Sequence, residues 1–220
     1  MLSSCFFSQS AIDVAKGLLG KIIHRYYNKQ WLCARIIETE AYCCDEKASH
    51  SSLGRTPKRE AMFMSPGTIY MYYARGKDSL NISCGNTGDA VLIKSAYPEL
   101  NDPKATDEML SMMQKLNPTH DNEIRPIEKL CKGQTLLCQA LALKVNNWDQ
   151  RQFDKAVFYI NDDHTQSRDI VQTKRLGIPL HRDAHLMYRY IDLDYIKYCT
   201  ENPLTKRNSV SDCDYIILSE

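Results

Sequence analysis

Two runs of β-branched and aromatic residues, separated by the polar turn Asn28-Lys29, constrain the fold of this chain most strongly. The runs span residues 21–27 and 31–42. Such residues favour strands, and a short polar turn between two strands indicates a β-hairpin. Side chains alternate between the two faces of a strand, so Glu38 and Glu40 are expected on one face. The same alternation adds Leu32, Ala34, Ile36 and Tyr42 to that face.

Further strands and helices follow from similar patterns. Strands are expected at residues 69–73, 80–83 and 90–96, and a meander of antiparallel strands is the simplest topology. Helices are expected at residues 11–20, from Asp102-Pro103 to Asn117-Pro118, and at 134–143. With 220 residues and 43% hydrophobic content, the chain can bury one core. We therefore expect an α+β fold, a single domain over residues 1–220 with a curved, largely antiparallel, barrel-like sheet flanked by helices.

The cysteines and the apolar segments bear on the compartment. The nine cysteines include no C-x-x-C pair, which favours reduced thiols over a structural metal site. No window approaches the roughly 18 apolar residues that a membrane span needs. We expect a soluble intracellular protein, in the cytoplasm or nucleoid, or in the nucleus of a eukaryote.

Positive charge is concentrated in one stretch although the net charge is only +1. Between Arg55 and Lys77 there are five basic residues and one acid, interleaved with four aromatic residues. Basic groups bind phosphates and aromatic faces stack on bases. Taken alone, the composition favours a solvated loop beside a tyrosine-rich strand over nucleic-acid binding.

The segment ETEAY (38–42) is the strongest candidate for chemistry. Two same-face carboxylates at the end of a strand, before a long loop, are not expected to be fully buried. Such a carboxylate can act as a general base, accepting a proton from a water that attacks an acetal-like carbon. The pattern does not distinguish Glu38 from Glu40, and two solvent-facing glutamates on an edge strand are the simpler interpretation.

Flat side chains flank this segment in the sequence. They are Tyr42, His50, Tyr70, Tyr72 and Tyr73. An enzyme that acts on a base within a duplex must rotate that base out of the stack, and aromatic walls replace part of the lost stacking. Taken one at a time, Tyr70, Tyr72 and Tyr73 are better explained by ordinary strand packing, and His50 by a position in a loop.

The order of these pieces is more specific than any one of them. The relevant stretches are FFSQSAIDVAKGLLGKII (6–23), RIIETEAY (35–42), ASHSSLGRTPKREAMFMSPGTIYMYY (48–73), LNIS (80–83), GDAVLIKSAYP (88–98), GQTLLCQALAL (133–143) and RLGI (175–178). Together they resemble the alkyladenine DNA glycosylases, from near the amino end of the chain almost to its carboxyl end.

The resemblance implies a reaction and a pocket. Glu40 lies where that family has its catalytic base, which activates a water that displaces the damaged base in one step and leaves an abasic site. Tyr42, His50 and Tyr72 lie at the base-stacking positions, and Asn81 lies at the pocket floor, where it excludes guanine. The implied partner is double-stranded DNA containing alkylated or deaminated purines, bound by a monomer that needs no cofactor and no metal.

Two positions depart from the family pattern. Arg75 stands where the family has a tyrosine wedge, and Lys94 stands where it has an arginine that orients the attacking water. We expect Arg75 to fill the gap left by the flipped nucleotide and Lys94 to keep the charge. The backbone carbonyl of Leu176 is expected to hold the same water. The DNA-binding residues expected are Arg55, Arg59, Arg75 and Lys77.

Two other classes of function are alternatives to a glycosylase. A non-catalytic protein that recognises damaged DNA with the same pocket would fit if Arg75 and Lys94 marked lost activity, but the retained Glu40 argues against it. A metal-dependent hydrolase would need a cluster of ligands. His181 and His185 are four residues apart, yet no glutamate follows His181 as in a zinc-protease helix, so we expect structural or surface histidines.

Overall fold

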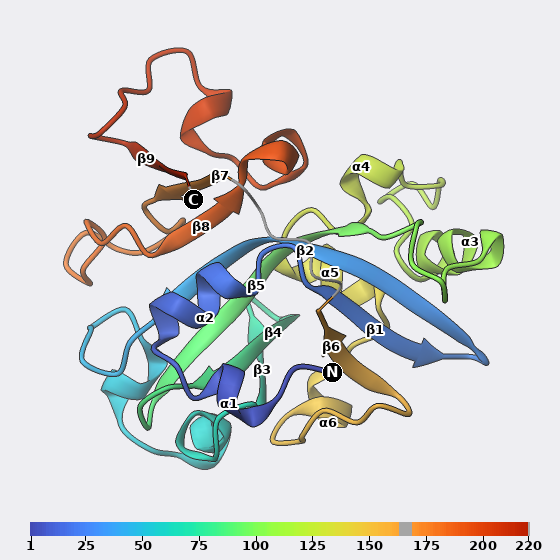
Figure 1. Cartoon of the computed structure of the whole chain (residues 1–220), viewed down its shortest axis with the longest axis horizontal. Coiled ribbons are helices and arrows are strands. Elements are labelled where there is room, and N and C mark those ends of the chain that lie inside the picture. Colours follow the sequence, from blue (N-terminus) through green and yellow to red (C-terminus); the bar gives the residue numbers. More distant parts are fainter. Residues whose placement is uncertain (163–168, 220) are drawn as a thin grey trace.

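The computed structural model describes residues 1–162 and 169–219, and they form an open antiparallel sheet with helices around it (Figure 1). The strands are β1 (Ile22–Tyr27), β2 (Gln30–Tyr42), β3 (Ile69–Ala74), β4 (Lys77–Cys84), β5 (Asp89–Pro98), β6 (Phe158–Asn161), β7 (Asp169–Thr173), β8 (Arg189–Asp192) and β9 (Tyr215–Ser219). The helices are α1 (Ser4–Phe7), α2 (Ala11–Gly17), α3 (Asp107–Leu116), α4 (Ile127–Leu130), α5 (Gln134–Ala140) and α6 (Val145–Trp148). Four short 3-10 helices span His50–Leu53, Pro57–Phe63, Leu193–Tyr198 and Pro203–Thr205.

The sheet branches at its longest strand, β2. Its strands follow the order β3-β4-β5-β2-β8-β7-β9, and β1 and β6 extend it from β2 on a side branch. One edge of β2 is shared, because β1 pairs with residues 30–35 and β8 pairs with residues 38–40. The curved sheet expected from the sequence is confirmed, but it is not closed, so it is a barrel only in its curvature (Figure 1).

Tight turns set where the strands of both early hairpins begin. Asn28 and Lys29 have φ of 49° and 66°, and they join β1 to β2 as expected. Arg75 and Gly76 have φ of 51° and 76° and join β3 to β4 in the same way. Two central residues with positive φ give the turn that best matches strand twist. Strand β4 therefore begins at Lys77, earlier than the residue 80 expected from the apolar run.

Helix α3 begins later than the sequence indicated. Thr106 caps its amino end by accepting a hydrogen bond from the backbone N–H of Met109, at 3.3 Å. The carboxylate of Asp102 instead accepts the backbone N–H of Lys104, which closes a separate turn before the helix. The expectation that Asp102-Pro103 opens the helix is therefore wrong, whereas Met109 and Met113 are buried in the core as expected.

The main core lies between the sheet and the helices. It joins α2, β2, β5, α3 and α5, and includes Val14, Leu18, Leu32, Leu80 and Leu137. Serine at position 10 caps α2, and the Thr39 hydroxyl donates to the Ala15 carbonyl, which fixes α2 against β2. Within the described ranges, no helix combines the length and apolar character needed to cross a membrane.

Candidate active site

A cavity of about 770 Å³ opens beside β2, β3, β4 and β5 and is bounded by the start of α5 and by residues 176–182. Ten residues singled out in the sequence line it: Glu40, Tyr42, His50, Tyr70, Tyr72, Arg75, Lys77, Asn81, Lys94 and Leu176. They come from segments more than 130 positions apart. Arg55 and Arg59 do not line it.

Glu40 is fully buried, yet one of its oxygens keeps capacity for a further hydrogen bond. The ammonium of Lys94 lies 3.2 Å from Oε1, and the Tyr42 hydroxyl donates to Oε2 at 2.7 Å. The Lys94 contact has ion-pair distance without hydrogen-bond geometry, so Oε1 accepts no hydrogen bond from any described residue. A buried carboxylate is stabilised in its charged form by such a cation. Glu40 is therefore suited to accept a proton from a molecule in the cavity.

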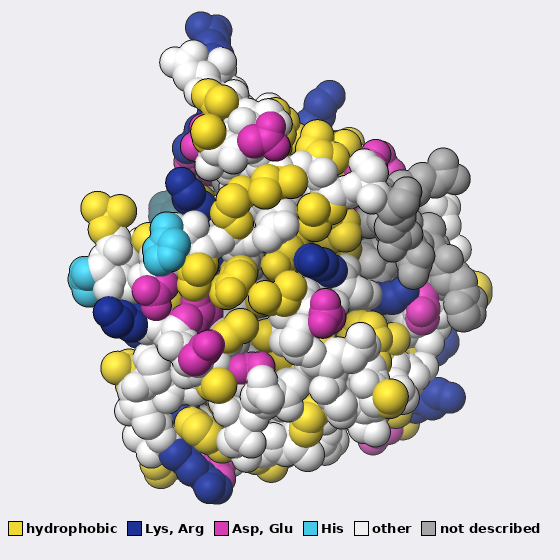
Figure 2. Space-filling model, turned by 60° about the vertical axis from the view of Figure 1, so that its left-hand side comes forward, with side chains coloured by type: hydrophobic (Ala, Val, Ile, Leu, Met, Phe, Trp, Pro, Cys, Tyr) yellow, Lys and Arg dark blue, Asp and Glu magenta, His cyan; other side chains and the backbone are white. Residues whose placement is uncertain are grey.

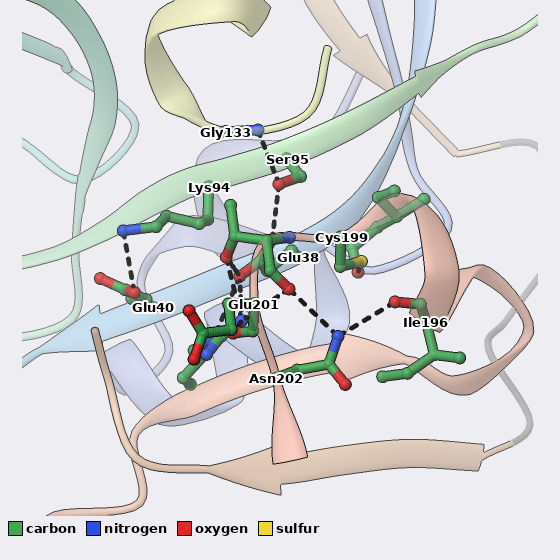
Figure 3. A network of polar contacts seen from close by, with 12 residues as sticks. Glu38, Glu40, Lys94, Ser95, Gly133, Ile196, Cys199, Glu201 and Asn202 are labelled. Carbon is green, nitrogen blue, oxygen red and sulfur yellow. Dashed lines mark hydrogen bonds and ion pairs between the residues drawn. The ribbon is translucent and has the colours of Figure 1, made fainter. Parts of the chain in front are cut away.

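Glu38 is fully buried as well, but its oxygens are fully engaged (Figure 3). The guanidinium of Arg189 donates from Nε at 2.8 Å, and Thr200 donates from both its backbone N–H and its hydroxyl. The Ser95 hydroxyl also donates to Glu38 while accepting the backbone N–H of Gly133, at the start of α5. Glu38 does not line the cavity. Its network instead fixes β2 to β5, β8 and the α5 start.

Both glutamates thus contradict the expectation of partial exposure, since each is 0% exposed. Their cations come from β5 and β8, which the alternation of β2 alone could not reveal. The β2–β5 register also shifts on both sides of Glu38. A bulge inserts a residue and interrupts alternation, so the single continuous face expected from Leu32 to Tyr42 is wrong.

Aromatic rings form one wall of the cavity. The rings of His50 and Tyr72 meet edge to face with centroids 4.5 Å apart, and Tyr70 stacks on Tyr72 at 5.5 Å. Nδ1 of His50 shares a hydrogen bond with the Tyr70 hydroxyl, at 2.8 Å. Burial, together with the charges of Arg59 and Arg182, lowers the pKa of His50, so its ring is neutral at pH 7.

The Tyr42 hydroxyl remains a hydrogen-bond donor to Glu40. Burial raises the pKa of Tyr42 well above its usual value, and the charge of Glu40 raises it further. Asn81 lies on β4, 4% exposed, and its amide nitrogen donates to the Tyr70 carbonyl at 3.3 Å. This bond fixes the orientation of the Asn81 amide at the cavity wall.

Arg75 and Lys77 lie at the exposed tip of the β3–β4 hairpin. The Arg75 guanidinium reaches toward Gly177, and its Nη2 would lie 3.8 Å from a Cβ built there. The hairpin tip therefore meets the segment that contains Leu176 at the cavity rim. Leu176 itself is 37% exposed.

The other expected basic residues are engaged locally. Arg55 forms an ion pair with Glu60, and Arg59 donates to the carbonyls of Leu53 and Gly54. On the face that Figure 2 shows, apolar side chains form a central patch, and Lys and Arg side chains are scattered around it. The five basic residues between Arg55 and Lys77 therefore form two groups. Arg75 and Lys77 lie at the cavity rim, whereas Arg55, Lys58 and Arg59 lie in or next to the 3-10 helix Pro57–Phe63.

Arg175 is a site residue that the sequence reasoning did not select. Its guanidinium donates to the Ala41 carbonyl at 2.7 Å and to both oxygens of Glu46, and its central carbon lies 4.5 Å from the centroid of the Tyr42 ring. Arg175 thereby anchors its own segment, including the adjacent Leu176, to the wall of the cavity. In the sequence, the only indication of a role for Arg175 is that it begins the RLGI stretch. No periodicity relates it to its partner Glu46, because the two residues are 129 positions apart.

Metal-capable side chains lie elsewhere. Among residues 1–162 and 169–219, one group of His, Cys, Asp or Glu side chains has donor atoms close enough to share an ion: His24, Cys33 and Asp102. None of the three lines the cavity, and neither His181 nor His185 belongs to the group.

Comparison with known proteins gives a consistent assignment. The model of the methylpurine-DNA glycosylase family matches residues 5–195. A protein of Pseudomonas savastanoi pv. phaseolicola, provisionally named a 3-methyladenine DNA glycosylase, is 52% identical over 98% of this chain and 96% of its own length. A protein of Clostridium beijerinckii with the same provisional name is 34% identical over 84% of this chain and 91% of its own length. The chain therefore belongs to the methylpurine-DNA glycosylase family.

Proposed function

We propose that this protein is a monofunctional DNA glycosylase that removes alkylated purines, 3-methyladenine and 7-methylguanine foremost, from duplex DNA by hydrolysis. The observation that carries the proposal is Glu40, a fully buried carboxylate with a cation beside it and an oxygen free to accept a proton, in a cavity with aromatic walls. Family membership agrees with this chemistry. The protein would act as an intracellular monomer.

The reaction is a single displacement. Glu40 Oε1 accepts a proton from water while the water oxygen bonds to the anomeric carbon of the nucleotide. The N-glycosidic bond breaks and its electron pair leaves with the base, so a cationic alkylated purine departs neutral. The Lys94 ammonium, 3.2 Å from Oε1, is the ion-pair partner of Glu40, and the Leu176 carbonyl, at the cavity edge, helps to hold the water. No lysine bonds to the sugar, so the product is an abasic site in an uncut strand.

Base selection rests on the aromatic wall. His50 and Tyr72 form one side of the space for a flipped purine, and Tyr42 forms another part of the lining. Electron-rich rings attract a base that alkylation has made cationic. Because His50 is neutral, it does not repel that charge. Asn81, fixed by its bond to the Tyr70 carbonyl, excludes the 2-amino group of normal guanine. Hypoxanthine and ethenoadenine, which are neutral, are the further candidates.

DNA would lie across the β3–β4 hairpin tip and the neighbouring 3-10 helices. Arg75 enters the gap left by the flipped nucleotide, while Lys77, Arg55 and Arg59 contact phosphates. The contact between Arg75 and the Gly177 segment supports this arrangement, because it places the guanidinium at the rim of the cavity that takes the base.

The experiment is the release of bases from methylated duplex DNA by the parent and by Glu40→Gln. We expect Glu40→Gln to release bases about 10²–10⁴-fold more slowly, while it still binds methylated duplex. Glu108→Gln is the matched control, since Glu108 is an exposed carboxylate on α3, and it should act like the parent.

Three other outcomes would overturn the proposal. Equal release by parent and Glu40→Gln removes Glu40 from the mechanism. Binding of methylated duplex without release by either protein identifies a non-catalytic recognition protein. Loss of release in EDTA by a protein that remains folded, as judged by its Tm, indicates a metal-dependent hydrolase.

A further inference from the structure

A cluster of three donor side chains joins the β1–β2 hairpin to the turn before α3. His24 on β1 lies directly opposite Cys33 on β2, and Asp102 reaches both from the turn. His24 Nδ1 is 3.5 Å from Cys33 Sγ, His24 Nε2 is 3.5 Å from an Asp102 oxygen, and Cys33 Sγ is 3.9 Å from the other Asp102 oxygen. The cluster is outside the cavity described above.

The histidine in this cluster is buried with an unsatisfied nitrogen. His24 is 2% exposed, and its Nε2 makes no hydrogen bond with any described residue. Leaving a buried polar atom unpaired destabilises the folded state. Stacking on Tyr159, with centroids 4.6 Å apart and planes at 10°, fixes the ring. The ring is therefore held in place with one nitrogen that no described residue satisfies.

The spacing of the donors is close to that around a small tetrahedral ion. Bonds of about 2.0–2.3 Å to nitrogen, oxygen and sulfur place the ligand atoms of a tetrahedral zinc site roughly 3.3–3.8 Å apart. One ligand atom can be chosen from each residue so that all three lie within 4.8 Å of one another. The two 3.5 Å contacts of His24 use its two different ring nitrogens. Shifts of about 1 Å would therefore bring one imidazole nitrogen, the thiolate and one carboxylate oxygen to the distances of a shared ion.

We propose that His24, Cys33 and Asp102 form a structural site for Zn²⁺, with water as the fourth ligand. The ion would tie the hairpin to the turn that precedes α3. An imidazole, a thiolate and a carboxylate are ligands that Zn²⁺ accepts together. Asp102 is the least buried of the three and lies on the surface turn, which gives the ion its route of entry.

One charge and one proton near the cluster oppose binding. The Lys104 ammonium donates to the Tyr159 hydroxyl and lies over the rings of Trp31 and Tyr159, at 4.2 Å and 4.7 Å from their centroids. Burial and Asp102 raise the pKa of Cys33, so the thiol is protonated in the metal-free protein. The Cys33 proton leaves to solvent when the S–metal bond forms, as in other thiolate sites.

The test is cobalt and zinc binding by the full-length protein after removal of metal with a chelator. Co²⁺ bound to a thiolate shows an intense charge-transfer absorption. We expect one equivalent of Co²⁺ to produce this band, Zn²⁺ to displace it, and Zn²⁺ to raise the Tm. Cys33→Ser should lose the band, and Asp102→Asn should bind about tenfold or more weakly. Cys131→Ala is the matched control, since Cys131 is a buried thiol outside the cluster, and it should retain both effects.

Two results would overturn the site. One is a parent protein without a thiolate–cobalt band and without a zinc-dependent Tm. The other is a band that survives Cys33→Ser, which would place the ion on another cysteine. If Cys33→Ser does not fold, Asp102→Asn decides, because it keeps the size of a side chain that belongs to a turn rather than to a strand. Parent-like binding by Asp102→Asn excludes the site. Base excision is not a readout here, so the outcome is independent of the proposed glycosylase activity.

Discussion

The guanidinium of Arg175 lies over the ring of Tyr42, with its central carbon 4.5 Å from the ring centroid, while two of its nitrogens bond both oxygens of Glu46. The Arg175 side chain thus connects its own segment, which continues into Leu176, with the tyrosine that donates to Glu40 and with the loop after β2. The buried Arg175–Glu46 ion pair therefore helps to fix the positions of Leu176 and Tyr42 at the cavity.

Arg175→Met should therefore destabilise the protein strongly. The side chains of Arg175 and Glu46 are 1% and 4% exposed, so the substitution leaves a buried carboxylate without its cation. Breaking a buried pair in this way typically costs about 3–5 kcal/mol of unfolding free energy. Urea denaturation of the parent and of Arg175→Met would measure this loss. Replacing both partners with methionine should cost much less than the single change. If Arg175→Met is as stable as the parent, the Arg175–Glu46 pair does not stabilise the site.

The Lys94–Glu40 ion pair gives a prediction about the excision rate. In Lys94→Met, the buried carboxylate of Glu40 loses the cation that lies 3.2 Å from Oε1. We expect the rate of base release at pH 7 to fall by about tenfold or more, because the charge beside the reacting water is lost. Lys94→Arg, which keeps the charge, should restore most of the rate. An unchanged rate in Lys94→Met would exclude an electrostatic role for Lys94.

The neutral state of His50 predicts how stability responds to acid. The pKa of His50 is below its ordinary value of 6.5, because burial and then Arg59 and Arg182 disfavour its charged form. The unfolded chain therefore binds a proton at position 50 at a higher pH than the folded chain does. This contribution to stability is complete above pH 6.5 and decreases as the pH falls below that value.

His50→Gln should accordingly lose less unfolding free energy than the parent between pH 7 and pH 5, measured by urea titrations in the presence of a chelator. His120→Gln is the control, since His120 is fully exposed, and its curve should follow that of the parent. If the His50→Gln curve also follows the parent, His50 is not a buried neutral group in solution.

Local patterns in the sequence predicted much of the fold because they depend on neighbouring residues. Alternation and turn chemistry were sufficient for the β1–β2 hairpin, and helical periodicity for α2 and the apolar face of α3. The errors also have local causes. The Arg75-Gly76 turn needs two residues of positive φ, and an arginine there gives no sequence signal for it. Strand β4 was therefore expected too late.

The choice between the two glutamates depends on partners far away in the chain. Glu38 is taken up by Arg189 and Thr200, which are 151 and 162 positions distant, while Glu40 meets Lys94 on a neighbouring strand. Periodicity within β2 treats both carboxylates alike and says nothing about these contacts. Tertiary structure separates them, since Glu38 is saturated with donors and Glu40 faces the cavity. The same applies to Arg175 and Glu46, which are 129 positions apart.

Variants of Arg75 would test whether its planar cation takes the place of the tyrosine wedge that the family resemblance leads us to expect. The side chain lies at the hairpin tip beside Gly177, where it could enter the gap left by a flipped nucleotide. Filling that gap matters only in a duplex, because a single strand has no stack to keep open. We therefore expect Arg75→Gly to lower excision from duplex DNA by about tenfold and to change excision from the same single-stranded sequence much less. Glycine suits this position, whose φ is +51°, so the backbone turn is retained.

Two variants separate wedge from phosphate contact in the same assay. Arg75→Lys keeps the charge but not the plane, so it should resemble Arg75→Gly on duplex DNA if stacking matters. Lys77→Ala removes a charge two residues away, so it should weaken binding to both kinds of DNA and reduce the salt dependence of binding by about one ion. Arg75→Gly that excises from duplex as fast as the parent would exclude the wedge, and Arg75→Lys at the parent rate would assign Arg75 to phosphate binding alone.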